Sequence, residues 1–491
     1  MKLLSLTRLI DRHHGRVKGF FRRFWQVISL EGLNGLKARV PRMIGARKTS
    51  FGFHLVPQEV SSKVKVVGRD MSETPDTPLE IAKIETPMES VKGTGCSKET
   101  LTPGALLLGH PYGVYGIGEH VRLSAAAFSA AEIPFGIRNI CGEYGVNLAG
   151  LHEDFPFMDK ISKDGFYRAN VFHINADEMV NAQIHLGKEI FADRYNVGYW
   201  AWELSNFPDA WCPSFQLVDE VWAPSRFIEQ AIANKTSSPV IRMPLAVNFP
   251  EPNGMTRESF GLPEDRFLFL FFFDFTSYVQ RKNPEGAIRA FLQAFPDVDD
   301  TRVGIVIKMN GVDLRPQEFN AFVQSIDRED PRVILMDKVL TDRETKALMK
   351  LCDCFLSLHR SEGFGRGLAE AMYLGKPVIA TGYSGNLDFT NEHNACLVDY
   401  RLIPVKDREY PFATGQKWAD PDIDHAVWYM RRLVNELHYA QMIGQNAAYF
   451  IKTYHSPNAV GAKYRARLSA LHGVRDCEAG KTIPSFRWNN L

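Results

Sequence analysis

The chain has 491 residues, of which 45% are hydrophobic and 23% charged, with 37 Gly and 27 Pro. This ordinary globular composition excludes a collagen-like, low-complexity or wholly disordered chain, and the length predicts two or three domains. No run of 18 apolar residues occurs, so we expect no transmembrane helix. Seven scattered cysteines, of which only Cys352 and Cys354 lie close together, favour a reduced protein without a zinc site.

Residues 1–50 form a basic segment with twelve Lys and Arg against two acidic residues, whereas the remainder of the chain is net acidic. Apolar residues recur at steps of three and four, which predicts an amphipathic helix. Such a helix suits an anionic membrane, although packing on the protein's own surface or a nucleic-acid arm would show the same pattern. We favour the membrane, do not expect nucleic acid, and predict a cytoplasmic protein that is peripheral on the inner membrane face.

Residues 51–102 lose this pattern. Ser, Thr, Pro, Glu and Lys dominate from Ser61 to Thr102, with no aromatic residue between them. A stretch of this composition buries little apolar surface, so we interpret it as a linker.

From residue 103 onward, short apolar strands alternate with helices, which is typical of parallel sheets covered on both faces. We expect a first doubly wound domain over 103–250 and a second over 251–425. The expected strands are 105–108, 169–174 and 197–200 in the first domain, and 267–273, 303–307, 333–336, 355–358 and 378–380 in the second.

Two helix starts are well marked in the second domain. Pro284 follows Asn283 as the first residue of a helix, and Thr341 forms a capping box with Glu344. Beyond residue 426 we expect only helices, packing back across the domains. The sequence thus predicts an α/β protein with two Rossmann-like domains facing across a cleft, preceded by a basic amphipathic helical extension.

The most informative stretch runs from Ser357 to Asn386. A buried strand ends at His359, where open α/β sheets bind ligands, and a Gly-containing loop then enters a helix whose N-terminus favours anions. Glu362 lies in the loop and Glu370 about two turns along the helix. Carboxylates beside a phosphate would repel it unless they accept hydrogen bonds from hydroxyl groups. A polyol attached to a diphosphate meets that demand.

This stretch resembles the retaining nucleotide-sugar glycosyltransferases of family 4, which have the two-Rossmann GT-B fold. Glu362 and Glu370 match the E-x7-E motif of that family, and its flanks are matched by Gly363, Phe364 and Gly365 and by residues 369–372. The resemblance covers roughly residues 104–470. It implies that Glu362 holds hydroxyls of the transferred sugar, that Glu370 holds the ribose hydroxyls, and that the donor's sugar and diphosphate are approached by Gly385 and Asn386.

The segment from Asp274 to Pro284 offers the cations that a leaving diphosphate needs where its charge grows. In the resembled family an arginine and, five positions later, a lysine do this. Lys282 matches the lysine, but Ser277 stands in the place of the arginine. Arg281 and Arg360 are both candidates to replace it.

Glycines follow the first strand of the first domain, where the backbone can approach a ligand closely. The resemblance implies that this loop approaches the donor phosphates at Gly116 and Gly118 and borders the acceptor at Glu119.

Further along the first domain, His173 ends a strand that faces the expected cleft. Family members often have a histidine thereabouts that contacts the transferred sugar, although a hydrogen-bonded core histidine fits equally well. Trp202 and Glu203 join an aromatic ring to a carboxylate, as the walls of acceptor sites do, but core packing explains them as well.

We therefore predict a retaining glycosyltransferase that moves a hexose, with a weak preference for mannose, from a nucleoside-diphosphate sugar to a glycan or lipid-linked acceptor in surface polysaccharide synthesis. We expect no metal and no tightly bound cofactor, only the nucleotide sugar as co-substrate. A sugar phosphorylase or a nucleotide-sugar epimerase could use the same two domains. A non-catalytic scaffold of a glycan-assembly complex is the third alternative. The missing arginine slightly favours it, whereas the intact Glu362, Glu370 and Lys282 argue against it.

Overall fold

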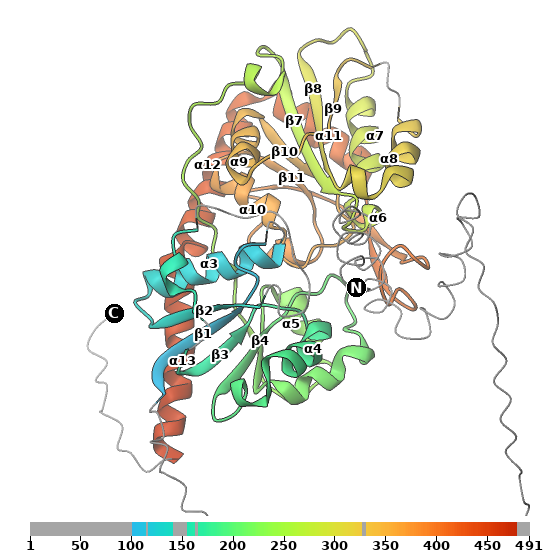
Figure 1. Ribbon diagram of the computed structural model, residues 1–491. Helices are drawn as coiled ribbons and strands as arrows, with labels where there is room; N and C mark the ends of the chain where they lie inside the picture. The colour runs from blue at the N-terminus through green and yellow to red at the C-terminus, as the bar shows by residue number, and fades with distance from the viewer. Residues whose placement is uncertain (1–100, 114–115, 141–154, 163–164, 327–329, 479–491) are drawn as a thin grey trace, which may run out of the picture. The chain divides into compact units, whose positions relative to one another are not determined.

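The computed structural model describes residues 101–113, 116–140, 155–162, 165–326 and 330–478 (Figure 1). The basic extension predicted over 1–50 lies outside the described residues, as does the linker of 51–102 apart from its last two residues. Within the described ranges, no helix combines the length and the apolar composition that a membrane span requires.

The first domain is built on a six-stranded sheet in the order β2-β1-β3-β4-β5-β6, in which every neighbouring pair is parallel. The three predicted strands are confirmed, with ends that shift by one to three residues. The strands are β1 (Thr102–Gly109), β2 (Phe135–Asn139), β3 (Tyr167–Phe172), β4 (Tyr195–Tyr199), β5 (Glu220–Ala223) and β6 (Val240–Arg242).

Helices connect these strands, as parallel pairing requires. They are α3 (Gly116–Ala130), α4 (Ala176–Leu186) and α5 (Arg226–Ala233), with 3₁₀ turns η1 (Met158–Lys160), η2 (Lys188–Ile190) and η3 (Asp209–Leu217). The hydroxyl of Ser225 caps α5 by accepting a hydrogen bond from the backbone of Ile228.

The second domain has its own parallel six-stranded sheet, in the order β12-β11-β10-β7-β8-β9. This is the order of a Rossmann sheet, with β7, which is apolar from Phe267 to Phe273, near its centre. All five predicted strands are confirmed, and β12 is an addition. The bounds are β7 (Phe267–Asp274), β8 (Val303–Asn310), β9 (Val333–Met336), β10 (Cys354–Ser357), β11 (Val378–Thr381) and β12 (Cys396–Val398).

The helices of the second domain begin where the sequence indicates. Pro284 opens α7, capped by the side chain of Asn283, and the capping box of Thr341 and Glu344 opens α9. The helices are α6 (Val279–Lys282), α7 (Pro284–Ala294), α8 (Pro316–Gln324), α9 (Asp342–Leu351) and α10 (Arg366–Tyr373), with 3₁₀ turns η4 (Glu258–Phe260), η5 (Val312–Leu314) and η6 (Gly385–Asp388).

A hairpin that the sequence did not suggest follows the second sheet. Its strands β13 (Tyr400–Pro404) and β14 (Lys417–Pro421) are antiparallel, and the loop 405–416 joins them. Tyr410 of this loop packs its ring against Trp202 of the first domain, with ring centroids 5.5 Å apart. Gln416 adds hydrogen bonds to the backbone of Asn206. The loop 405–416 therefore joins the hydrophobic core of the first domain.

The last described residues form three helices, α11 (Ile423–Asn435), α12 (Leu437–Tyr454) and α13 (Pro457–Glu478). The long helix α13 lies beside α3 of the first domain (Figure 1). Tyr464 of α13 is fully buried and stacks on Trp222 at 5.0 Å between ring centroids, while Arg467 forms an ion pair with the buried Glu220. Helix α13 thus completes the core of the first domain.

Candidate active site

Each sheet has one point at which the strand order reverses, between β1 and β3 in the first and between β7 and β10 in the second. Ligands of open α/β sheets bind beyond the carboxyl ends of the strands at such points. The residues predicted from the sequence follow these four strands. Gly116 and Gly118 follow β1, His173 follows β3, Arg281 and Lys282 follow β7, and Glu362 follows β10.

The carboxylate of Glu362 is paired with two cationic side chains. One of its carboxylate oxygens contacts the ammonium of Lys282 and lies 3.3 Å from Nη1 of Arg281. Burial by itself would raise the pKa of Glu362, but Lys282 and Arg281 outweigh it and lower the pKa to about 2. Glu362 is therefore ionised at neutral pH. The same two cations, beside the carboxyl ends of β7 and β10, could hold a diphosphate.

Arg281 takes up the place that the missing arginine leaves. Its Nη2 donates a hydrogen bond of 3.1 Å to the hydroxyl of Ser277, the residue at the family's arginine position, and Nη1 donates to the carbonyl of Ser361 at 2.9 Å. Its Nε lies 2.9 Å from a carboxylate oxygen of Glu203. Burial disfavours the charged form of Arg281, but Glu203 and Glu362 outweigh it and raise the pKa. The residue is buried, with 2% of its surface exposed.

Arg360, the other candidate, points elsewhere. It donates to the backbone carbonyl of Gln280 at 2.7 Å, lies 3.6 Å from Asp420 and packs over the ring of Trp418. These contacts tie Arg360 to the hairpin rather than to Glu362. Of the two alternatives that the sequence left open, the geometry favours Arg281.

Glu370 lies on α10 and is 4% exposed. Nζ of Lys346, on α9, lies 2.5 Å from one of its oxygens, and Nε of Arg366 lies 3.4 Å from the other. Sequence reasoning missed both cations. Arg366 stands four residues before Glu370 on the same helix and could have been found from that spacing, whereas Lys346 on another helix gives no such signal.

The loops on either side of Glu362 touch along their backbones. A Cβ on Gly385 would overlap the carbonyl of Gly363, so only glycine allows this approach. Gly365 has φ +95°, a left-handed conformation that favours glycine, directly before α10. Two residues predicted to contact the donor have structural contacts in their place. The ring of Phe364 packs against Phe389, and the side-chain amide of the fully buried Asn386 forms hydrogen bonds with His359 and Thr381. Any contact of Asn386 with a ligand would therefore come from its backbone.

In the first domain, a Cβ on Gly118 would overlap the carbonyl of Gly113, whereas a Cβ on Gly116 would meet open space. Glu119 is paired with Arg122 at 2.5 Å. Burial would raise its pKa, but Arg366 of the second domain, together with Arg122, lowers it. Two arginines thus hold Glu119 as an anion.

His173 is fully buried, and among the described residues neither of its ring nitrogens has a hydrogen-bond partner. The ring of His120 lies edge-on at 4.8 Å between centroids. Burial, with His120 beside it, pushes the pKa of His173 well below its usual value, so the ring is neutral. Buried polar atoms nearly always have partners, so these two nitrogens are an exception to that rule. The sequence did not suggest His120.

The predicted acceptor wall at Trp202 and Glu203 needs correction. Trp202 is 3% exposed, donates its indole N–H to the carbonyl of Asn206 and packs among aromatic rings of the first domain, because so large an apolar ring gains most from full burial. It is a core residue rather than a wall. Glu203 does reach the site, where it pairs with Arg281.

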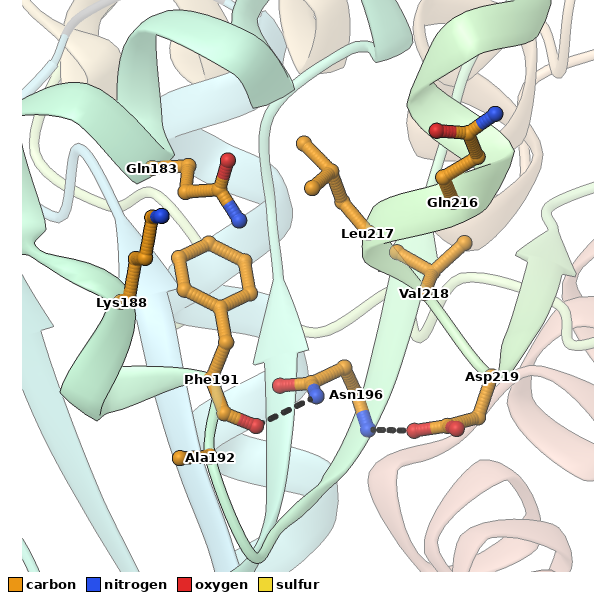
Figure 2. A pocket seen from close by; sticks show the side chains of 9 residues that line it. All are labelled: Gln183, Lys188, Phe191, Ala192, Asn196, Gln216, Leu217, Val218 and Asp219. Carbon is orange, nitrogen blue, oxygen red and sulfur yellow. Dashed lines mark hydrogen bonds between the residues drawn. The ribbon is translucent and has the colours of Figure 1, made fainter. Parts of the chain in front are cut away.

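In the described part of the chain, no group of three or more His, Cys, Asp or Glu side chains is arranged to hold a metal ion. Cys352 and Cys354 are buried there as free thiols. A pocket lined by residues such as Lys188, Asn196 and Asp219 opens at the start of β4 and β5, as Figure 2 shows. The pocket therefore lies at the amino ends of the strands, whereas the charged site lies beyond their carboxyl ends.

Comparisons with known proteins bear on this site. Residues 275–409 match a family model described as glycosyl transferases group 1. A comparison of the sequence with curated proteins gives no match. The matched stretch contains Arg281, Lys282, Glu362 and Glu370.

Several solved structures share the fold at low sequence identity. HepE from Anabaena, in complex with UDP and glucose, is 14% identical with a TM-score of 0.54, and the match covers 75% of this chain and 100% of that one. Sucrose-phosphate synthase from Thermosynechococcus elongatus is 15% identical with a TM-score of 0.55, over 76% and 100%. A glycosyltransferase from Rickettsia africae is 14% identical with a TM-score of 0.53, over 75% and 98%.

The fold is thus GT-B, with two Rossmann-like domains. Residues 275–409, which lie in the second domain, match the model of glycosyl transferases group 1, and the protein is an enzyme of the glycosyltransferase class.

Proposed function

We propose that this enzyme transfers a hexose from a nucleoside-diphosphate sugar to a glycan or lipid-linked acceptor in surface polysaccharide synthesis, with retention of the anomeric configuration. The observation that carries the proposal is the contact of Glu362 with both Arg281 and Lys282 at the switch point of the second sheet. This cluster joins an acceptor of sugar hydroxyls to two donors for phosphate oxygens. Membership of family 4, which rests on the E-x7-E motif, belongs to the proposal.

In the proposed complex, Arg281 and Lys282 take the diphosphate and Glu362 accepts hydrogen bonds from the hexose. Glu370 accepts hydrogen bonds from the ribose, and His173 offers its free nitrogens to the sugar. Without a ligand, each glutamate is neutralised by two cations of the protein. An arriving diphosphate competes with Glu362 for Arg281 and Lys282, which frees the carboxylate for hydroxyl groups.

We propose front-side displacement as the chemical step. The bond between the anomeric carbon and the diphosphate oxygen breaks, the acceptor oxygen bonds to the same face of that carbon, and the leaving diphosphate takes the acceptor's proton. Arg281 and Lys282 stabilise the charge that grows on the leaving group. The route needs no nucleophile from the protein, and Glu362 remains a hydrogen-bond acceptor throughout.

The nucleotide and the hexose are open to direct measurement. UDP and glucose are bound in the HepE structure, which makes UDP-glucose the first donor to test, and GDP-mannose follows from our weak preference for mannose. Thermal stabilisation by each sugar nucleotide identifies the donor, because a ligand that binds only the folded state raises its stability by mass action. Release of free hexose or nucleotide then reports turnover with water as the acceptor.

The decisive variant is Glu370→Ala, with Glu258→Ala as its matched control on an exposed turn of the same domain. We expect E370A to lose nucleotide stabilisation and E258A to keep it. Unchanged nucleotide affinity in E370A would remove Glu370 from the donor site. A wild-type protein that none of the sugar nucleotides stabilises would overturn the proposed function itself.

We propose further that residues 1–50 bring the enzyme to the inner face of an anionic membrane, where a lipid-linked acceptor would be found. The support is their excess of basic residues and their amphipathic pattern. Flotation of the full chain with anionic liposomes tests this, with neutral liposomes as the control. Equal recovery with both kinds of liposome would contradict the proposal.

A further inference from the structure

The guanidinium of Arg281 is held by residues from two domains. Its own domain supplies the hydroxyl of Ser277 and the carbonyl of Ser361, both by hydrogen bonds. The first domain supplies Glu203, which follows β4 and brings a carboxylate oxygen to 2.9 Å from Nε of Arg281. Both domains thus contact the guanidinium: the second through two hydrogen bonds, and the first through an ion pair in which Nε of Arg281 makes no hydrogen bond to Glu203.

Glu203 is itself held in place by the loop 405–416. The hydroxyl of Tyr410 donates a hydrogen bond of 2.7 Å to the carboxylate oxygen that faces Arg281. The ring of Tyr410 lies between Trp202 and Tyr278, with centroid distances of 5.5 and 4.8 Å. Burial and the nearby Glu203 raise the pKa of Tyr410 well above its usual value, so its hydroxyl stays protonated and donates.

We propose that Glu203 and Tyr410 are positioning residues for Arg281, an inference that rests on the proposed function. Glu203 orients the guanidinium toward the leaving diphosphate, and Tyr410 fixes Glu203. The cation clamp of the second domain is therefore complete only while the first domain contributes its carboxylate. This role replaces the contact with the acceptor that the sequence suggested for Glu203.

The charges around Arg281 predict an effect that packing alone would not produce. Arg281 and Lys282 face two carboxylates, Glu203 and Glu362. Neutralising Glu203 leaves the cluster with an excess positive charge, which attracts a nucleoside diphosphate at least as strongly as before. The guanidinium, however, keeps its two hydrogen bonds within the second domain but loses the carboxylate that attracts it from the first, and misplacement of a catalytic group slows the reaction. Affinity for the nucleotide and turnover should therefore separate.

The test compares Glu203→Gln, Glu203→Asp and Tyr410→Phe with wild type. UDP binding is measured by calorimetry, with GDP as the second probe, and turnover by hydrolysis of UDP-glucose or of whichever sugar nucleotide stabilises the wild type. Arg242→Gln is the matched control, because Arg242 also pairs across the two domains, with Asp388 at 3.5 Å, at an exposed position.

We expect E203Q to lower kcat about tenfold while the Kd for UDP stays equal or falls. Y410F should lower kcat about threefold, because it removes the hydrogen bond that holds Glu203. E203D, which keeps the charge, should recover part of the loss, and R242Q should match wild type. Melting temperatures of all variants report whether the fold is intact.

Two results would overturn the inference while leaving the proposed function in place. One is wild-type kcat in E203Q, and the other is an equal loss of UDP affinity and kcat in E203Q. If E203Q hydrolyses the sugar nucleotide at the wild-type rate but has a raised KM for a glycan acceptor, the inference is likewise overturned. Glu203 would then contact the acceptor, as the sequence suggested. Failure of the wild type to bind any nucleotide would instead reject the proposed function.

Discussion

Lys346 and Glu370 lie on different helices, α9 and α10, and their side chains form an ion pair of 2.5 Å in which both partners are buried. The stem of Lys346 also lies near the ring of Phe249, which its ammonium approaches to 4.9 Å from the centroid. Removal of one partner from a buried pair leaves an uncompensated charge, which is costly. This pair therefore fixes the acid that we assign to the ribose.

Lys346→Met should lower the free energy of unfolding by about 3 kcal/mol. The double variant K346M/E370M should lose less unfolding free energy than K346M and E370M lose together, because each single variant already breaks the same ion pair. Lys350→Met is the control on the same helix: its pair with Glu251 is exposed and should be worth less than about 1 kcal/mol. Urea denaturation measures all four, and additive losses would contradict a specific pair.

Arg281→Gln should reduce kcat by about a hundredfold or more, the usual cost of losing a group that stabilises developing charge. The exposed Arg302, in the same domain, provides the control variant Arg302→Gln, which should keep wild-type turnover. The exchange S277R/R281S returns the arginine to the family position. We expect it to regain part of the activity that R281Q loses, and no recovery would mean that position 281 has another role.

The pH dependence of stability should report the pair of Lys282 and Glu362. The pKa of Glu362 in the folded protein is about 2, below its ordinary value of 4.5, so the ionised form stabilises the fold above pH 4.5. This contribution disappears as the pH falls through the folded pKa. Lys282→Met removes one of the cations that depress the pKa and should destabilise the protein at neutral pH.

The difference in melting temperature between wild type and K282M should accordingly be constant above about pH 4.5 and shrink toward about pH 2. Lys417→Met, at an exposed position on β14, should show no such trend. A difference that does not change with pH would show that Lys282 stabilises the protein through packing alone.

Two glycines of the first domain should behave differently when replaced. Gly118→Ala places a methyl group on the carbonyl of Gly113 and should destabilise the protein by about 1–3 kcal/mol, whereas Gly116→Ala meets open space and should unfold like wild type. If donor phosphates approach this loop, as the family resemblance implies, G116A should still weaken nucleotide binding. Calorimetry with UDP and thermal unfolding separate the two effects.

Turnover should persist in excess chelator, because the proposed clamp consists of Arg281 and Lys282. Hydrolysis of the sugar nucleotide is measured with and without EDTA, and readdition of Mg²⁺ or Mn²⁺ is the control. Loss of turnover in EDTA with recovery by a metal ion would show that a cation assists the leaving group.

The sheets could be predicted because their strands are apolar runs with clear turn signals. The strand at Phe267–Phe273 and the helix starts at Pro284 and Thr341 each depend on residues close together in the chain, and the structure confirms them. The strands β2, β5, β6 and β12 were missed, because a Glu or Arg interrupts the apolar run in β2, β5 and β6, and β12 is only three residues long.

The acids and cations of the site were partly within reach of sequence reasoning. Glu362, Glu370 and Lys282 follow from a motif, but whether Arg281 or Arg360 replaces the missing arginine depends on where each side chain points. Lys346 and Tyr410 owe their positions to contacts between segments distant in the sequence, which no local pattern reports. The hairpin of β13 and β14 was missed for the same reason.

The loop 405–416 has a consequence for engineering this enzyme. GT-B proteins invite chimaeras in which one protein's donor domain is joined to another's acceptor domain by a cut between the sheets. Here such a cut would separate Tyr410 from Trp202 and Glu203, and Tyr464 from Trp222. A functional hybrid must therefore take the loop 405–416 and helix α13 from the same protein as the acceptor domain. The two domains cannot be exchanged independently, because these two segments pack into the core of the first domain.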